Sequence, residues 1–298
     1  MKILLFGKSG QVGWELQRSL APLGELIALD FDDKELCGDF TDLKGIVRTV
    51  QAVAPDVIVN AAAHTAVDKA ESEPDIARTI NASAPGVLAV EAKSINALLV
   101  HYSTDYVYDG SGDKPWLESD ASAPLSVYGA TKLEGEKLIQ QAGCKHLIFR
   151  TSWVYGARGG NFAKTMLRLA AERDSLSVID DQIGAPTGAD LLADVTAHAI
   201  FASIRQPELT GLYHLVASGE TSWHGYANFV INFAKRAGVS LKVAPEAIKA
   251  VATSEFRTAA KRPLNSRMGC DKLQKSFDLN LPNWQIGVER MLTEILDK

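Results

Sequence analysis

Residues 2–13 read KILLFGKSGQVG, and this stretch decides the fold class. A short apolar run is followed at once by three glycines, Gly7, Gly10 and Gly13, in a Gly-x-x-Gly-x-x-Gly spacing. A glycine-rich turn between a first strand and a first helix lets backbone amides and the helix N-terminus bind a pyrophosphate. The standard fingerprint is Gly-x-Gly-x-x-Gly, and a glycine turn can also be purely structural. Its place at the first strand-to-helix turn nevertheless predicts a dinucleotide-binding unit.

The first half of the chain alternates short aliphatic or β-branched runs with longer segments of helical period. This alternation is typical of βαβ units that build a parallel sheet. We predict strands at residues 2–6, 25–29, 57–60, 98–103 and 146–151, and helices at about 13–20, 43–53, 74–93 and 128–142. The order predicts an α/β fold with a Rossmann-like, doubly wound parallel sheet.

The alternation loosens after residue 153, which predicts a smaller C-terminal substrate-binding lobe. Loop-forming stretches appear there at residues 156–160, 180–188 and 261–266. We therefore divide the chain into a dinucleotide-binding domain, residues 1–152, and a lobe of mainly substrate-binding function, residues 153–298. Later segments near residues 190–216, such as 211–216, are candidates to return to the first domain.

The composition fits a packed, soluble protein. The 298 residues carry a formal net charge of −5, and 46% of them are hydrophobic and 22% charged. The acidic balance argues against general nucleic-acid binding, which depends on many cations facing phosphates. The N-terminal apolar run is too short for a signal peptide or a membrane span, so we expect a cytoplasmic protein with no membrane partner. Three scattered cysteines, Cys37, Cys144 and Cys270, form neither a disulfide framework nor a zinc-ligand spacing.

Asp30 is the candidate ribose ligand. It follows the second predicted strand, seventeen residues after Gly13, near the place where a carboxylate accepts a hydrogen bond from an adenosine ribose. A carboxylate there favours NADH, whereas Lys8 and Lys34 would attract the 2′-phosphate of NADPH. Both cofactors therefore stay open, as does the alternative that Asp30 only caps a turn.

Tyr128 and Lys132 are the candidate catalytic pair. Four residues separate them at the start of a predicted helix, so they share one helix face. A nearby ammonium favours the phenolate form and brings the tyrosine closer to acid/base work at neutral pH. The pattern alone is common on helix surfaces, but Thr104 at the end of the fourth predicted strand adds a hydroxyl that could donate to a substrate carbonyl.

Longer segments carry a resemblance to a known family. They read NAAAHTAVDKAE at 60–71, STDYVY at 103–108, RTSWVY at 150–155, DQIGAPT at 181–187 and RPLNS at 262–266. Together with the glycine turn and the Thr, Tyr and Lys set, they make the chain resemble, over its whole length, the dTDP-4-dehydrorhamnose reductases. That family belongs to the extended short-chain dehydrogenase/reductases.

The resemblance implies reduction of the C4 ketone of dTDP-4-dehydro-6-deoxy-L-mannose by NADPH or NADH. The product would be dTDP-L-rhamnose, a precursor for lipopolysaccharide O-antigen and other cell-surface polysaccharide. Tyr128 would protonate the forming alkoxide, with Lys132 and Thr104 orienting it. The resemblance further implies cofactor contacts from Gly10, Gln11, Val12, Asp30, Asp39, Phe40, Ala63, His64, Thr65, Tyr102, Tyr128 and Lys132, and substrate contacts from Thr104, Asp105 and Trp153. For Trp153, a place in the core is the alternative to a flat platform for a deoxysugar.

The family also implies a homodimer linked by Mg²⁺. The matching carboxylates are Glu15, Asp190 and Glu294, although a glutamate is expected where Asp190 stands and surface carboxylates are more often solvated. A basic group near the C-terminus is a separate candidate, because at least one of its members could bind the diphosphate of a sugar nucleotide while the others are solvated. Its members are Arg257, Lys261, Arg262 and Arg267.

Two other functions stay open at this stage. A sugar-nucleotide epimerase uses the same Tyr and Lys but retains NAD through its cycle. A non-catalytic, NADP-binding regulatory subunit is the alternative from another class, and intact Thr104, Tyr128 and Lys132 argue against it. A dehydratase is disfavoured, because Tyr106 follows Asp105 where the dehydratases carry a glutamate.

Overall fold

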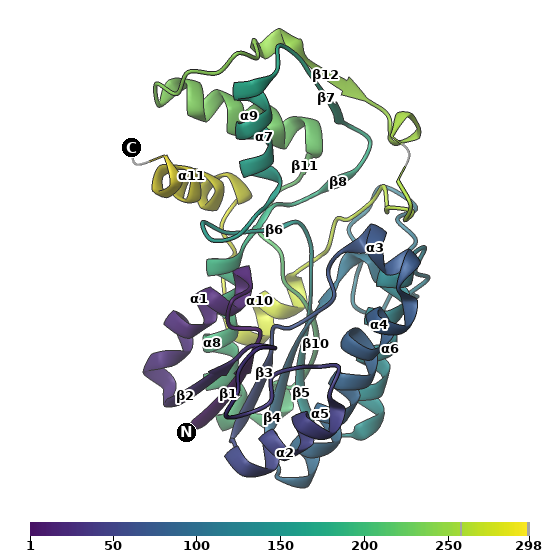
Figure 1. The fold of residues 1–298 in the computed structure, drawn as a ribbon, viewed down its shortest axis with the longest axis vertical. Helices are drawn as coiled ribbons and strands as arrows, with labels where there is room; N and C mark the ends of the chain where they lie inside the picture. The colour runs from purple at the N-terminus through teal and green to yellow at the C-terminus, as the bar shows by residue number, and fades with distance from the viewer. Residues whose placement is uncertain (257, 297–298) are drawn as a thin grey trace.

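A six-stranded parallel sheet forms the centre of the protein in the computed structural model, which describes residues 1–256 and 258–296. The strands lie in the order β10-β5-β4-β3-β1-β2, which is doubly wound, as predicted (Figure 1). Their bounds are β1 Lys2–Phe6, β2 Glu25–Leu29, β3 Val57–Asn60, β4 Leu98–Thr104, β5 Lys145–Thr151 and β10 Gly211–His214. The segment predicted to return from the second half is thus the edge strand β10.

Helices cover both faces of the sheet because alternate residues of each strand point to opposite sides. Ile3 and Leu5 of β1 pack on one side, and Leu4 and Phe6 pack on the other. The first side is covered by α1 (Gln11–Leu20), α8 (Ala189–Arg205) and α10 (Asp271–Phe277). The second is covered by α2 (Leu43–Val53), α5 (Ala84–Ser94) and α6 (Val127–Ala142), with α3 (Val67–Ser72) and α4 (Pro74–Arg78) beside α6 (Figure 1).

The single helix predicted over residues 74–93 is wrong in one respect. The structure divides it into α4, a π-helical turn at Thr79–Ser83 (η2) and α5. Pro85 has no N–H to donate to the carbonyl of Asn81, and Ala84 N–H bonds instead to Thr79 O, five residues back. The proline therefore shifts the hydrogen-bond pattern and places an extra residue in the turn.

The C-terminal lobe stands on the sheet domain and has apolar clusters of its own, built around residues such as Tyr226 and Ile231 (Figure 1). Its helices are α7 (Phe162–Glu172), α9 (Trp223–Arg236) and α11 (Trp284–Ile295). Short strand pairs join its loops: β6 (Val154–Tyr155) with β9 (Thr187–Gly188), β7 (Leu176–Ile179) with β12 (Ile248–Val251), and β8 (Ile183–Gly184) with β11 (Thr221–Ser222). Single 3₁₀ turns lie at Ala21–Leu23 (η1), Asp105–Val107 (η3), Pro207–Leu209 (η4), Pro245–Ala247 (η5) and Thr253–Glu255 (η6).

Across the described residues, no helix combines the length and the apolar character that a membrane crossing requires.

Candidate active site

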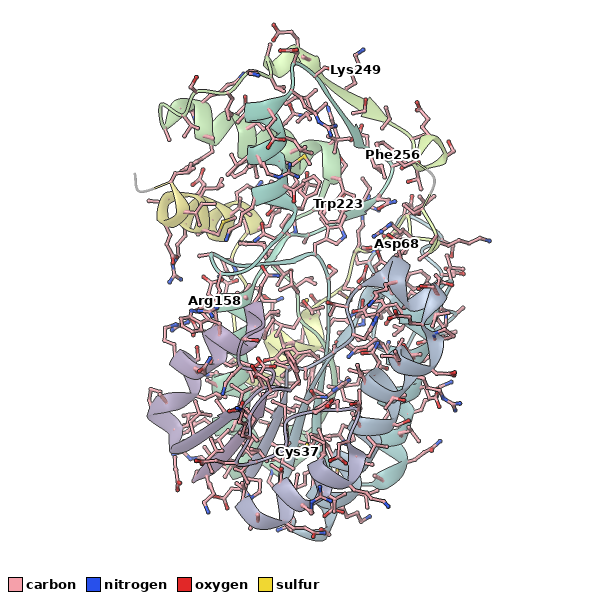
Figure 2. All side chains as sticks on the ribbon, viewed as in Figure 1. Cys37, Asp68, Arg158, Trp223, Lys249 and Phe256 are labelled. Atoms are coloured by element: carbon pink, nitrogen blue, oxygen red, sulfur yellow. The ribbon has the colours of Figure 1, made fainter. Side chains whose placement is uncertain are left out.

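A cavity of about 380 Å³ lies at the carboxyl ends of β1, β3, β4 and β5, where open α/β sheets bind their ligands. Figure 2 shows the two sides that face each other there, with Asp68 on α3 below and Trp223 on α9 above. Most of the predicted site residues line this cavity: Gly10, Gln11, Val12, Ala63, Thr65, Tyr102, Thr104, Asp105, Tyr128, Lys132 and Trp153.

The glycine turn is built for close approach of backbone segments. Gly7 has a φ of +85°, and a Cβ there would lie 2.7 Å from the amide nitrogen of Ala62. A Cβ on Gly13 would lie 1.9 Å from the carbonyl oxygen of Gly7. Gly7 and Gly13 allow the turn to form but do not line the cavity. Gly10 lines the cavity at the N-terminus of α1. A helix N-terminus with free amides fits a pyrophosphate.

Tyr128 is held at the first turn of α6. The Ser126 side chain accepts a hydrogen bond from Gly129 N at 3.2 Å, which caps the helix. A Cβ on Gly129 would lie 2.1 Å from Tyr106 O, so a glycine lets the start of the helix approach η3. The ring of Tyr128 then packs edge-on against Tyr106, with centroids 5.4 Å apart.

The charge states of the catalytic pair differ from the expectation that Lys132 favours the phenolate. Burial raises the pKa of Tyr128, and a hydrogen bond with the Thr104 hydroxyl opposes this only in part. Lys132 is directed elsewhere, because its Nζ donates to Tyr102 O at 2.5 Å. Burial lowers the pKa of Lys132 to about 8, although Glu136 opposes the shift. Tyr128 is therefore neutral in this structure, which is the form that can donate a proton.

Asp105 joins the sheet domain to the second lobe. Its Oδ1 accepts a hydrogen bond from Thr104 Oγ1 at 2.9 Å, and its Oδ2 accepts one from Ser266 Oγ at 2.5 Å. Burial raises the pKa of Asp105 to about 6 against these hydrogen bonds. The resemblance segments at 103–108 and 262–266 thus meet at one carboxylate.

Trp153 belongs both to the cavity wall and to a stacked pair. Its backbone φ is +50°, which non-glycine residues rarely adopt, and it lies two residues after the end of β5. The ring stacks on Trp223 of α9 at a centroid distance of 3.6 Å. A Cβ on Gly184 would lie 2.9 Å from Trp153 Cε2, so the end of β8 passes close to the indole. Strained residues of this kind concentrate at functional sites.

Other predicted cofactor residues do not line the cavity. Asp30 Oδ2 accepts a hydrogen bond from Ser9 N at 3.1 Å, beside the glycine turn. Lys8 forms an ion pair with Asp33 at 2.7 Å and is not a free cation. Three more predicted cofactor residues come later in the sequence. Asp39 accepts hydrogen bonds from Thr41, and Phe40 is buried against Phe6. The backbone N–H of His64 donates a hydrogen bond to Asn81.

Asn81 lies outside the cavity lining but holds two segments of the site together, and the sequence analysis missed it. It sits on the π-helical turn η2, where its Oδ1 accepts from His64 N at 2.9 Å. Its Nδ2 donates to His64 O at 3.1 Å and to Thr131 Oγ1 at 3.3 Å. Asn81 therefore fixes the loop after β3 to α6. The available signal was an asparagine four positions before a proline within a predicted helix. Other cavity residues that were missed are Ala61, Val67, Ser103, Tyr106, Thr151, Ser152 and Val154.

Comparison with known proteins agrees with this geometry. The family model described as the RmlD substrate binding domain matches residues 1–296. A dTDP-4-dehydrorhamnose reductase of Salmonella typhimurium is 61% identical over 295 residues, which are 99% of this chain and 98% of that protein. The chain belongs to the dTDP-4-dehydrorhamnose reductase family.

Solved structures of dTDP-4-dehydrorhamnose reductases have the same fold. The enzyme of Clostridium acetobutylicum is 36% identical with a TM-score of 0.88, and the match covers 100% of both chains. The enzyme of Bacillus anthracis, solved in complex with NADP, is 35% identical with a TM-score of 0.86 and matches 98% of this chain and 99% of that one. The predicted fold and family resemblance are therefore confirmed, and so is the prediction of an oxidoreductase.

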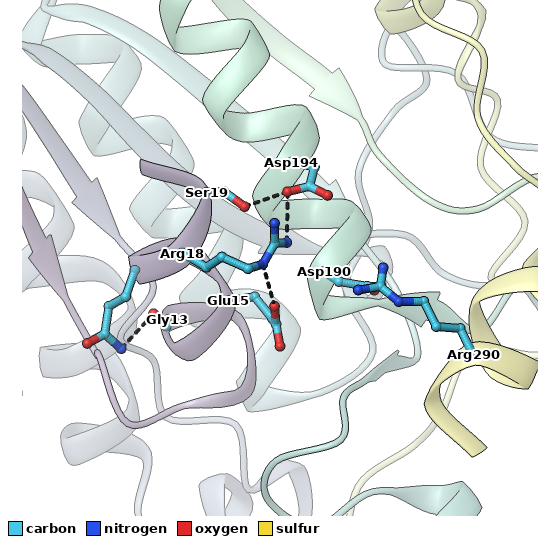
Figure 3. Close-up of polar contacts among 8 residues, drawn as sticks. Gly13, Glu15, Arg18, Ser19, Asp190, Asp194 and Arg290 are labelled. Carbon is cyan, nitrogen blue, oxygen red and sulfur yellow. Dashed lines mark hydrogen bonds and ion pairs between the residues drawn. The ribbon is translucent and has the colours of Figure 1, made fainter. Parts of the chain in front are cut away.

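The metal ligands predicted from the reductase family lie together, away from the active site. Glu15, Asp190 and Glu294 line a separate cavity of about 20 Å³. Figure 3 shows Arg290 reaching Asp190 from α11, where Nη1 donates to Oδ2 at 2.9 Å, and Arg18 bonded to Glu15. Residues 1–256 and 258–296 contain no group of three or more His, Cys, Asp or Glu residues that could hold a metal ion.

The predicted basic group is spread over several places. Arg262 donates to Asp68 at 2.7 Å and to the Tyr106 hydroxyl at 3.3 Å, at the edge of the cavity. Arg267 forms an ion pair with Glu220 at 2.6 Å. Of the remaining two members, Lys261 is exposed and Arg257 lies outside the described residues. Arg262 is thus the described member that touches a residue of the cavity wall.

Proposed function

We propose that this reductase converts dTDP-4-dehydro-6-deoxy-L-mannose to dTDP-L-rhamnose by reducing its C4 ketone with NADPH or NADH. The observation that carries the proposal is that Tyr128 and Thr104 line one cavity together with residues of the glycine turn. Membership of the family supports the assignment of the substrate. The NADP complex of the Bacillus anthracis relative supports the assignment of the cofactor.

The residues of the cavity suit a dinucleotide. Gly10, Gln11 and Val12 would hold the pyrophosphate at the N-terminus of α1, and Ala63 and Thr65 leave room above β3. Gly7, Gly13, Asp30, Asp39, Phe40, His64 and Tyr102 complete the proposed cofactor set. The nicotinamide, when bound, supplies the hydride. Asp30 and the ion pair of Lys8 with Asp33 favour NADH, whereas the NADP complex of the Bacillus anthracis relative supports NADPH, so the proposal includes both cofactors.

Tyr128 acts as the proton donor in this proposal. Its phenolic proton passes to the oxygen at C4 as that oxygen becomes an alkoxide. The Thr104 hydroxyl would hold the same oxygen by a hydrogen bond, for which it must turn away from Asp105 Oδ1. Lys132 orients the ribose next to the nicotinamide. Its ammonium also stabilises the negative charge on Tyr128 after the proton has been transferred. Asp105 and Trp153 bind the sugar, the first by its carboxyl oxygens and the second by its flat face.

We propose that residues 1–152 bind the dinucleotide and that residues 153–298 mainly bind the sugar nucleotide, with β10 returned to the sheet. Arg262 is the candidate for the substrate diphosphate, because its guanidinium already reaches the hydroxyl of Tyr106. Both substrates are charged nucleotides that do not cross membranes unaided, which supports a cytoplasmic enzyme. The product would enter O-antigen or other surface polysaccharide.

The homodimer and its Mg²⁺ are separate proposals. Glu15, Asp190 and Glu294 face one small cavity at the surface, so carboxylates of a second copy could complete a ligand set there. Arg290 would first have to release Asp190. No step of the reduction depends on this metal.

The deciding experiment mixes the purified protein with dTDP-4-dehydrorhamnose and follows the absorbance of NADPH, then of NADH, with and without magnesium. Oxidation of the cofactor coupled to formation of dTDP-L-rhamnose is the expected result. Conversion of a sugar nucleotide without net cofactor oxidation would indicate an epimerase instead. Cofactor binding without turnover of either kind would indicate a regulatory subunit.

A further inference from the structure

Three buried polar side chains form a chain that leads away from the cavity behind Lys132. Asn60 Nδ2 lies 3.0 Å from His101 Nδ1, and His101 Nε2 lies 3.2 Å from Lys132 Nζ. Asn60 of β3 and His101 of β4 are direct partners in the sheet, and both are 1% exposed. Neither Asn60 nor His101 lines the cavity.

The orientation of the Asn60 amide fixes the proton on the His101 ring. Asn60 Oδ1 accepts a hydrogen bond from Ala62 N at 3.0 Å, so the amide NH₂ group is the part that faces His101 Nδ1. Nδ1 must then accept, and a neutral ring carries its proton on Nε2. That proton points at Lys132 Nζ.

This arrangement fits a neutral Lys132 and conflicts with a charged one. A neutral amine accepts the proton of His101 Nε2 and still donates to Tyr102 O. An ammonium has no lone pair, so Nε2 would have to accept and the ring proton would move to Nδ1. There it would meet the NH₂ group of Asn60, and the amide could turn only by breaking its hydrogen bond with Ala62.

We propose that His101 is a positioning residue of the reductase, and that the Asn60–His101–Lys132 chain ties the charge of the lysine to the tautomer of a buried imidazole. The proposal rests on the proposed function, in which Lys132 orients the cofactor and stabilises the negative charge that Tyr128 acquires on proton transfer. His101 would thus act on the reaction in addition to Thr104, Tyr128 and Lys132, without touching the substrate.

The other groups that face Lys132 leave its charge dependent on the tautomer of His101. Tyr128 and Glu136 lie one turn before and one turn after it on α6, and Glu136 is already paired with Arg150 of β5 at 2.6 Å. Tyr102 of β4 contributes its carbonyl, while its hydroxyl bonds to Thr196. Burial lowers the pKa of His101 well below its usual value, so the ring stays neutral while the lysine titrates.

Nitrogen NMR of the imidazole rings tests the coupling without substrate or turnover. His101 is one of six histidines, and its signals are assigned by their loss in His101→Gln. We expect a neutral ring protonated on Nε2 at about pH 10, with ¹⁵N shifts that change along one titration curve down to about pH 6. Shifts that stay constant over this range, or a proton on Nδ1 throughout, would overturn the proposal. This readout stays valid if the substrate assignment fails.

The pH profile of kcat/KM provides the second test. In His101→Gln, an amide oxygen can accept from the ammonium of Lys132 without a tautomer change, so the alkaline limb should move upward by about one pH unit. The matched control is His146→Gln, because His146 lies on neighbouring β5 and its ring, among the residues that the structure describes, hydrogen-bonds to Cys144 O alone. The control should keep the wild-type profile. An unmoved limb in a folded His101→Gln enzyme would show that His101 has only a structural role.

Discussion

At the scale of single residues, Tyr128 differs from an ordinary surface tyrosine by its burial. Its pKa is raised, so it keeps its proton to a higher pH than a surface tyrosine does. Tyr128→Phe removes that proton and little volume. We expect a loss of about 100- to 10,000-fold in kcat, the usual contribution of a general acid.

Cofactor binding should persist in Tyr128→Phe and is measured as the rise in melting temperature at a saturating cofactor concentration. Loss of this rise would mean that the variant has lost the site as a whole. Turnover close to that of the wild type would exclude Tyr128 as the proton donor.

Asp105 leads to a prediction about stability and pH. Its folded-state pKa of about 6 lies above the ordinary value, so the fold favours the neutral acid. That stabilisation is complete below about pH 4 and is lost as the pH rises through about 6. Relative to Asp105→Asn, the wild type should lose about 3 kcal/mol of unfolding free energy over this range.

Urea unfolding at a series of pH values measures the Asp105 difference. The control is Asp113→Asn, an exposed carboxylate in the following loop, whose difference from wild type should stay flat. A flat difference for Asp105→Asn would show that the carboxyl is hydrated in the folded protein.

The position of Tyr128 and Lys132 on one helix face could be predicted from their spacing, but their charge states could not. A spacing of four residues determines which face they share, whereas the pKa of each depends on burial by distant segments. The same holds for Asp105, because its partner Ser266 lies 161 residues away in sequence. Local sequence patterns contain no signal for such a pair.

At the scale of elements, α6 is attached to the sheet by a buried ion pair. Glu136 bonds to Arg150 of β5 through both carboxylate oxygens, and it also accepts from Ser103 of β4. Glu136→Gln leaves the guanidinium of Arg150 buried without its counter-charge. We expect a loss of about 3–5 kcal/mol in the free energy of unfolding, measured in urea.

The matched control for Glu136 is Glu134→Gln on the same helix. Glu134 also makes a bidentate pair, with Arg78, but that pair is exposed, so stability should change little. In a double-mutant cycle, Glu136→Leu with Arg150→Met should cost less than the sum of the two single changes. Additive costs would mean that the two side chains act independently.

Most elements of the sheet domain could be predicted, because hydrophobic periodicity is a local property. The predicted strands at 2–6, 25–29 and 57–60 agree with β1, β2 and β3, and the predicted helix at 43–53 agrees with α2. The π-helical turn η2 could not be predicted, since its cause is one missing N–H at Pro85 within an otherwise helical pattern.

At the scale of the whole molecule, one side carries charged and apolar side chains from three helices. Arg18 of α1 bonds to Asp194 of α8 at 2.8 Å, and Arg290 of α11 bonds to Asp190 (Figure 3). Ile286 of α11 is 61% exposed beside them. The ion pairs on this surface could not be predicted from the sequence, because Asp190 lies 100 residues from Arg290 and Asp194 lies 176 residues from Arg18.

If two copies pair through this surface, Ile286→Asp should shift the mass in solution from dimer to monomer, because it places a carboxylate in an apolar contact. Light scattering at several protein concentrations measures that mass. Val90→Asp on α5 is the control, since Val90 is 58% exposed on the opposite side of the sheet and should not alter it. Removing magnesium with a chelator separates the two proposals: a dimer that persists without the metal supports pairing and contradicts a metal bridge. A monomer at every concentration would contradict both.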